Sequence, residues 1–112
     1  MPDKTEEWMA LADVYAEALL TAADEQNTAE EVAAELAELI RYMDGDPDFA
    51  NFLTATSVDD DPRRASLEKL FRGRMSDLSL NLLQVLNNRG RLNLIRQIHR
   101  CVELHMKKRR HQ

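Results

Sequence analysis

The chain contains few of the residues that interrupt helices, build β-sheets or form disulfide frameworks. Its 112 residues include three Gly, three Pro and one Cys, and aromatic residues make up only 5%. The single Cys101 excludes an internal disulfide framework, and the scarcity of Val, Ile and aromatic residues argues against strands. No apolar run is long enough to cross a membrane, and the acidic first seven residues lack the basic region of a secretory signal. We therefore expect a protein of a reducing, cytoplasmic compartment.

Ala and Leu dominate the hydrophobic residues, which form 44% of the chain and recur at helical spacing. A chain of this length is long enough for one domain with its own core and too short for two ordinary domains. The composition therefore predicts a single all-α domain.

Helix start and stop signals divide the chain into six segments. Thr28 with Glu31 forms a capping-box pattern, the Asp46-Pro47 and Asp61-Pro62 pairs each place a capping carboxylate before a Pro, and Gly residues lie near several helix ends. The expected helices run over about Glu6–Glu25, from Thr28 to Gly45, from Asp46 to Thr54, from Asp61 to Gly73, from Ser76 or Asp77 to about Gly90, and over about Leu92–Lys107. Because the connections are short, we predict a six-helix bundle with antiparallel neighbours. Its third helix should bury Phe49, Phe52 and Leu53, and its fourth Leu67, Leu70 and Phe71.

Two of the expected helices carry more apolar surface than one core contact requires. Apolar residues fill most of the circumference of the first helix, whereas one contact needs a stripe of roughly 100°. At one edge of this surface lie Val14, Tyr15, Ala18 and Ala22. On the fifth helix Leu83 and Leu86 share one side, and an adjoining stripe consists of Leu78, Leu82, Val85 and Arg89. The first helix should therefore either lie at the centre of its bundle or bind on two sides, and the fifth helix likewise has apolar surface beyond its core contact.

Charge is distributed very unevenly along the chain. Residues 1–62 contain 17 acidic against two basic residues, a net −15, and the remainder contains three acidic against 13 basic residues, a net +10. The two halves can complement each other within one bundle. Alternatively, the chain is a small helical RNA-binding or other nucleic-acid-binding module whose binding surface is the basic half. No aromatic residue for base stacking follows Phe71, however.

No set of residues completes a metal, cofactor or catalytic motif. The stretch from Asp44 to Asp48 resembles the opening of a calcium loop, but Phe49 and Ala55 stand where such a loop needs Gly and Glu. His99, Cys101 and His105 share one helix but point in different directions at this spacing. There is no phosphate-binding Gly-rich loop and no nucleophile elbow. We expect no metal, no cofactor and no enzymatic activity.

Four segments, in this order and spacing, carry a resemblance to a known family. They are Tyr15-Ala16-Glu17-Ala18-Leu19, Asp48 to Leu53, Leu67 to Phe71, and Asn81-Leu82 through Asn88-Arg89-Gly90-Arg91-Leu92. From about Met9 to Met106 the chain resembles the N-terminal helical domain of the delta subunit of F-type ATP synthases, called the oligomycin-sensitivity-conferring protein in mitochondria.

The resemblance implies a non-catalytic stator or adaptor subunit that links the catalytic head to the peripheral stalk during ATP synthesis and proton transport. It implies that the N-terminal helix of an alpha subunit binds between the first and fifth helices, on Tyr15, Ala18, Leu82 and Val85. Such a domain is peripheral on the inner face of an energy-transducing membrane, as part of the synthase, and has no direct membrane insertion.

The resemblance also sets the expected domain boundaries. Residues 1–106 form the helical domain, and residues 107–112 form a basic tail or the start of a linker. Family members continue into a second domain that contacts the b-type stalk subunits, and that domain is missing from this sequence.

Overall fold

A computed structural model describes residues 4–55 and 59–110 of the chain. It contains α1 (Lys4–Glu25), α2 (Ala29–Gly45), α3 (Pro47–Thr54), α4 (Asp60–Phe71), α5 (Asp77–Asn88), the 3-10 helix η1 (Leu92–Leu94) and α6 (Ile95–Arg110). No strand is present among these residues. The prediction of an all-α fold with six helices is confirmed.

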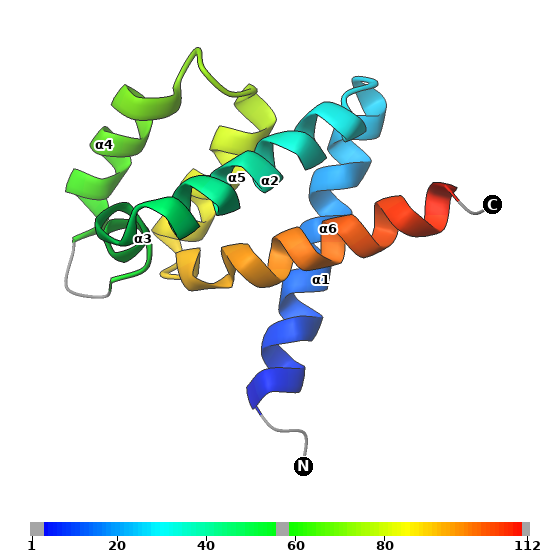
Figure 1. Ribbon diagram of the computed structural model, residues 1–112, viewed down its shortest axis with the longest axis horizontal. Coiled ribbons are helices and arrows are strands. Elements are labelled where there is room, and N and C mark those ends of the chain that lie inside the picture. Colours follow the sequence, from blue (N-terminus) through cyan, green and yellow to red (C-terminus); the bar gives the residue numbers. More distant parts are fainter. Residues whose placement is uncertain (1–3, 56–58, 111–112) are drawn as a thin grey trace.

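Helix α6 lies at the centre of the arrangement. It packs against α1, which it crosses steeply, and against α2 (Figure 1). Helix α5 contacts α1, α2 and α4, so it connects α4 to the part of the bundle that contains α1 and α2. The first turns of α1 project beyond the rest of the bundle (Figure 1).

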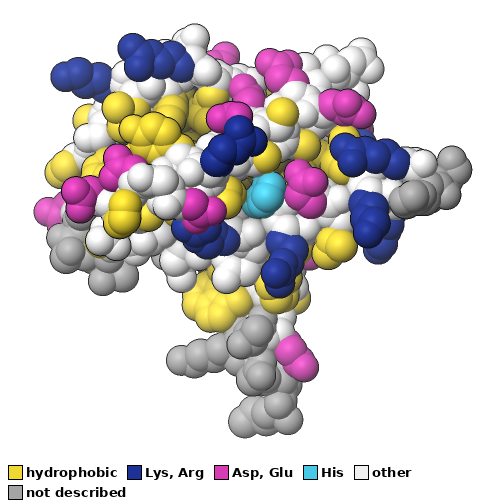
Figure 2. Space-filling view, in the orientation of Figure 1, with side chains coloured by type: hydrophobic (Ala, Val, Ile, Leu, Met, Phe, Trp, Pro, Cys, Tyr) yellow, Lys and Arg dark blue, Asp and Glu magenta, His cyan; other side chains and the backbone are white. Residues whose placement is uncertain are grey.

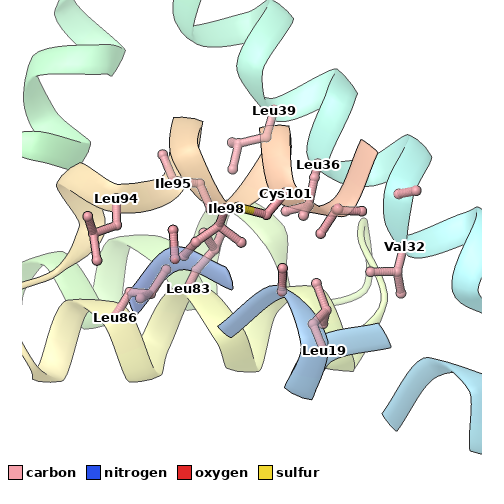
Figure 3. Close-up of a cluster of buried hydrophobic side chains, with 14 of the residues drawn as sticks. Leu19, Val32, Leu36, Leu39, Leu83, Leu86, Leu94, Ile95, Ile98 and Cys101 are labelled. Carbon is pink, nitrogen blue, oxygen red and sulfur yellow. The ribbon is translucent and has the colours of Figure 1, made fainter. Parts of the chain in front are cut away.

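The core consists mainly of Leu side chains, together with Ala, Ile, Val and Met, and every helix contributes to it. Near the centre of the core, Ile95, Ile98 and Cys101 of α6 lie between leucines of α2 and α5 (Figure 3). The largest side chains that are fully buried include Leu36, Leu53, Leu67, Leu80, Leu83, Leu86, Leu94, Ile95, Ile98, Val32 and Val102. The leucine periodicity therefore does place one face of each helix in a shared core.

Two helix starts agree with the sequence signals. The carboxylate of Asp46 accepts a hydrogen bond from the Phe49 backbone N–H at 3.1 Å, and Pro47 occupies the first position of α3. The Ser76 hydroxyl likewise accepts a bond from the Ser79 N–H at 3.3 Å. Both caps use partners within three residues, which is why they were predictable.

The capping box expected at Thr28 is absent. The Thr28 hydroxyl donates instead to the carbonyl of Ala23 at 3.4 Å, at the end of α1, and no side chain caps α2. The cause is the tight connection, in which Asn27 adopts a left-handed backbone conformation with φ 60°. The Thr28 N–H also bonds to the Ala23 carbonyl at 2.8 Å, while the Thr28 carbonyl accepts a bond from the Val32 N–H at 2.9 Å. Thr28 therefore completes α1 with its side chain and N–H and opens α2 with its backbone carbonyl alone.

The buried face of α4 differs from the prediction. Leu67 is fully buried and Phe71 partly buried, but Leu70 is 41% exposed. Arg63 is buried instead, because it lies one turn before Leu67 on the side that meets α5. The helix begins at Asp60 with Asp59 at its N-cap and no side-chain capping bond, so the prediction that Asp61 caps this helix is wrong. On α3, Leu53 is fully buried and the two Phe residues are partly buried.

The C-terminal basic residues continue α6. Lys107 to Arg110 are helical, so within the described residues the expected tail is the last turn of a helix. Four basic residues suit this position, because the carbonyl end of a helix favours positive charge. Residues 111–112 lie outside the described part.

Candidate functional site

The candidate site is the outer surface of α1 and α5, two helices that contact each other directly. We call it the α1/α5 surface and define it by the eight residues predicted from the sequence: Val14, Tyr15, Ala18, Ala22, Leu78, Leu82, Val85 and Arg89. None of the eight is buried, and Val14, Ala18, Val85 and Arg89 are exposed. In Figure 1 the two helices run in roughly opposite directions.

On α1, the core and the α1/α5 surface occupy different sides of the helix. The residues that face the core are small or apolar and nearly fully buried: Ala12, Ala16, Leu19, Leu20 and Ala23. Val14 remains 61% exposed, although it lies in the middle of the helix. Of the four predicted residues of α1, Val14 and Ala18 are thus left exposed by the described chain, and Tyr15 and Ala22 are partly covered.

Helix α5 repeats this division. Leu80, Leu83 and Leu86 are fully buried, Leu82 and Leu78 are partly buried, and Val85 is 43% exposed. The exposed stripe therefore adjoins the buried one, as the period of the helix requires.

One hydrogen bond fixes an aromatic ring at this surface. The guanidinium of Arg91 donates to the Tyr15 hydroxyl at 2.8 Å, joining the segment after α5 to α1. Arg91 is partly buried and was not among the predicted site residues. Its partner lies 76 positions away, so no local pattern pointed to it.

A hollow that is separate from the α1/α5 surface lies between α2 and α4. It has a volume of about 500 Å³, and Tyr42, Phe49, Leu70 and Phe71 line it together with acidic residues of α2. Figure 2 shows hydrophobic side chains gathered there. The ring of Phe49 contacts those of Tyr42 and Phe71 at centroid distances of 4.6 and 6.0 Å. The exposed Leu70 faces this hollow, which explains its incomplete burial.

Several basic residues of the C-terminal half pair with acidic residues of the N-terminal half. Arg96 lies 2.8 Å from Asp44, and Arg109 makes two hydrogen bonds of 2.9 Å to Asp24. The described residues also contain one group that could hold a metal ion, formed by Asp13, Glu17 and His105. None of the described helices is long and apolar enough to span a membrane.

A small helical bundle with an apolar side on two adjacent helices is typical of an interaction domain. Residues 11–112 match the family described as ATP synthase delta (OSCP) subunit. The chain belongs to this family, which confirms the resemblance seen in the sequence.

Three relatives illustrate the similarity. The ATP synthase subunit delta of Leptospira interrogans is 38% identical over 100 residues, which cover 88% of this chain and 52% of the relative. That of Prochlorococcus marinus is 29% identical over 96 residues, 85% of this chain and 53% of the relative. The organellar chromatophore protein of Paulinella chromatophora, also an ATP synthase subunit delta, is 30% identical over 89 residues, 80% of this chain and 49% of the relative. The chain thus spans about half the length of the curated relatives it matches.

Proposed function

We propose that this domain is a non-catalytic adaptor of an F-type ATP synthase that binds the N-terminal helix of an alpha subunit on the α1/α5 surface. In this way it connects the catalytic head to the peripheral stalk, on the inner face of the energy-transducing membrane. Attachment to the b-type stalk subunits belongs to the part of the family's length that this sequence does not span.

The observation that supports this proposal is the exposure of Val14 and Val85 on two helices that touch. Apolar side chains on neighbouring helices lose contact with water when a third helix lies along them. Ala18 and Ala22 have short side chains, so a partner backbone can approach α1 closely. Tyr15 adds a ring whose hydroxyl already has a partner in Arg91, so burying it leaves no unpaired polar atom.

Replacing Val85 with Asp tests the proposal. Because Val85 is 43% exposed, the variant should fold normally. It should bind a synthetic peptide of the alpha N-terminus at least about tenfold more weakly, since burying an unpaired carboxylate costs several kcal/mol. Circular dichroism reports folding, and titration calorimetry with the peptide reports affinity.

Two variants serve as controls. Leu104 on α6 is 52% exposed, so Leu104→Asp introduces the same charge at a comparable exposure away from α5 and should leave peptide binding unchanged. Leu83→Asp places the charge in the core and should unfold the domain. Undiminished binding by Val85→Asp, or its unfolding, would contradict the proposed site.

A further inference from the structure

Three potential metal ligands meet where α1 crosses α6. Asp13 and Glu17 lie one turn apart on α1, and His105 lies opposite them on α6. One ligand atom from each residue falls within 4.8 Å of the other two. The Asp13 Oδ1 and His105 Nε2 atoms are only 2.7 Å apart.

The charges at this point are not balanced. Two carboxylates face one imidazole, which carries at most one positive charge. Glu17 has no hydrogen bond or ion pair with any described residue, and it is exposed. Arg109, one turn after His105, is engaged by both carboxylate oxygens of Asp24. A divalent cation would compensate the excess negative charge.

We propose that Asp13, Glu17 and His105 form a binding site for a divalent transition-metal ion of the Zn²⁺ type, with water completing its coordination. Zinc binds nitrogen and carboxylate oxygen at about 2.0–2.2 Å, so tetrahedral ligand atoms lie roughly 3.4 Å apart. Asp13 and His105 meet in a hydrogen bond of 2.7 Å, which a bound ion would replace as the two atoms separate to the ligand spacing, and Glu17 is exposed beside them. An imidazole with two carboxylates favours Zn²⁺, Co²⁺ or Ni²⁺ over Mg²⁺ and Ca²⁺, which prefer more oxygen ligands.

Cys101 lies one turn before His105 but is not part of this set. Its sulfur does not fall within the group of neighbouring ligand atoms. Burial, and next the charge of Asp13, also raise the pKa of its thiol and so disfavour the thiolate that binds metals. The site therefore offers three protein ligands. Because they come from two helices, a bound ion would tie α1 to α6, and it would stabilise the folded state by mass action. The sequence led us to expect no metal, because Asp13 and His105 are separated by 92 positions. This inference is independent of the proposed function.

Titration calorimetry with ZnCl₂ at pH 7.5, together with thermal unfolding followed by circular dichroism, tests the site. The wild-type chain should bind one Zn²⁺ and gain several degrees in unfolding temperature, whereas millimolar Mg²⁺ should change nothing. His105→Asn and Glu17→Gln should each weaken Zn²⁺ binding at least tenfold. Glu17→Gln alters an exposed side chain that has no hydrogen bond or ion pair with a described residue, so it keeps the test decisive even if His105→Asn folds poorly.

Matched controls locate the ion. His99 has a side-chain exposure of 23%, close to the 26% of His105, and has its own carboxylate neighbour in Glu103 at 3.5 Å. His99→Asn and Cys101→Ala should bind Zn²⁺ as the wild type does, because neither residue belongs to the group of three ligands. The proposal is overturned if the wild type shows no binding at 1 mM Zn²⁺. It is also overturned if the two site variants bind normally, or if a control variant abolishes binding.

Discussion

Arg63 holds the end of α3 and the start of α4 against α5. Its guanidinium donates to the Phe52 carbonyl at 3.0 Å, to the Ala55 carbonyl, and to the Asn87 side-chain oxygen at 3.1 Å. The Asn87 amide in turn donates to the Asp60 carbonyl at 2.9 Å. This one side chain satisfies carbonyl groups that the last turn of α3 would otherwise leave unpaired.

Replacing Arg63 with Ala should lower the free energy of unfolding by about 3 kcal/mol. The variant loses charge-assisted hydrogen bonds and leaves buried acceptors without donors. Arg63→Lys should recover only part of the loss, because an ammonium cannot reproduce the planar fork of the guanidinium. Urea denaturation followed by circular dichroism measures the effect.

The neighbouring Arg64 provides the control. It is exposed and pairs with Asp61 at 2.9 Å on the same helix, so Arg64→Ala should change stability by less than about 0.5 kcal/mol. Equal losses for the two variants would show that the Arg63 network contributes nothing beyond surface charge.

What the sequence could predict depended on the distance between partners along the chain. Asp46 and Ser76 cap their own helices, and a local pattern revealed both. Arg63 acts on residues eight to 24 positions away, and Asp13 meets His105 across 92 positions. No local sequence pattern indicates contacts between residues so far apart. The buried Arg63 and the three proposed metal ligands were therefore visible only in the fold.

At the level of elements, the start of α5 is joined to the middle of α2. The Glu35 carboxylate accepts hydrogen bonds from the Ser76 N–H and hydroxyl, each at 2.6 Å, and from the Ser79 hydroxyl at 2.7 Å. The carboxylate also lies at the positive end of the α5 dipole. Two helices far apart in sequence are thereby held in register by one side chain.

Glu35→Ala should reduce the free energy of unfolding by about 2 kcal/mol, because three charge-assisted bonds to a helix N-terminus are lost. Glu38→Ala on the same helix removes only an exposed ion pair with Arg41 and should cost less than about 0.5 kcal/mol. The two variants can be compared by thermal and urea unfolding. A Glu35→Ala variant as stable as Glu38→Ala would contradict the role assigned to this carboxylate.

Helix start and stop signals predicted the six elements, and helix periodicity predicted their buried faces. Periodicity also indicated which residues of α1 and α5 lie beside the core-facing ones, because burial follows the 3.6-residue period along each helix. It could not show that Leu70 borders a hollow, since that depends on where α2 lies relative to α4. It also missed the end of α6, because basic residues are compatible with a tail and with a last helical turn.

At the scale of the whole molecule, the acidic and basic halves of the sequence attract each other in the fold. Helix α6 from the basic half lies against α1 and α2 from the acidic half. Its arginines contact both partners, through Arg109 with Asp24 on α1 and Arg96 with Asp44 on α2. These two pairs offset part of the charge asymmetry along the sequence within the fold.

Salt should therefore destabilise the domain. The two arginine pairs are partly exposed, so each contributes at most about 1 kcal/mol, and ions screen them readily. Raising NaCl from 20 to 500 mM should lower the free energy of unfolding by about 1 kcal/mol in urea titrations. A variant carrying Asp24→Asn and Asp44→Asn should be less stable at low salt and respond less to added salt. Stability that rises with salt would instead mean that repulsion within the net charge of −5 outweighs attraction between the halves.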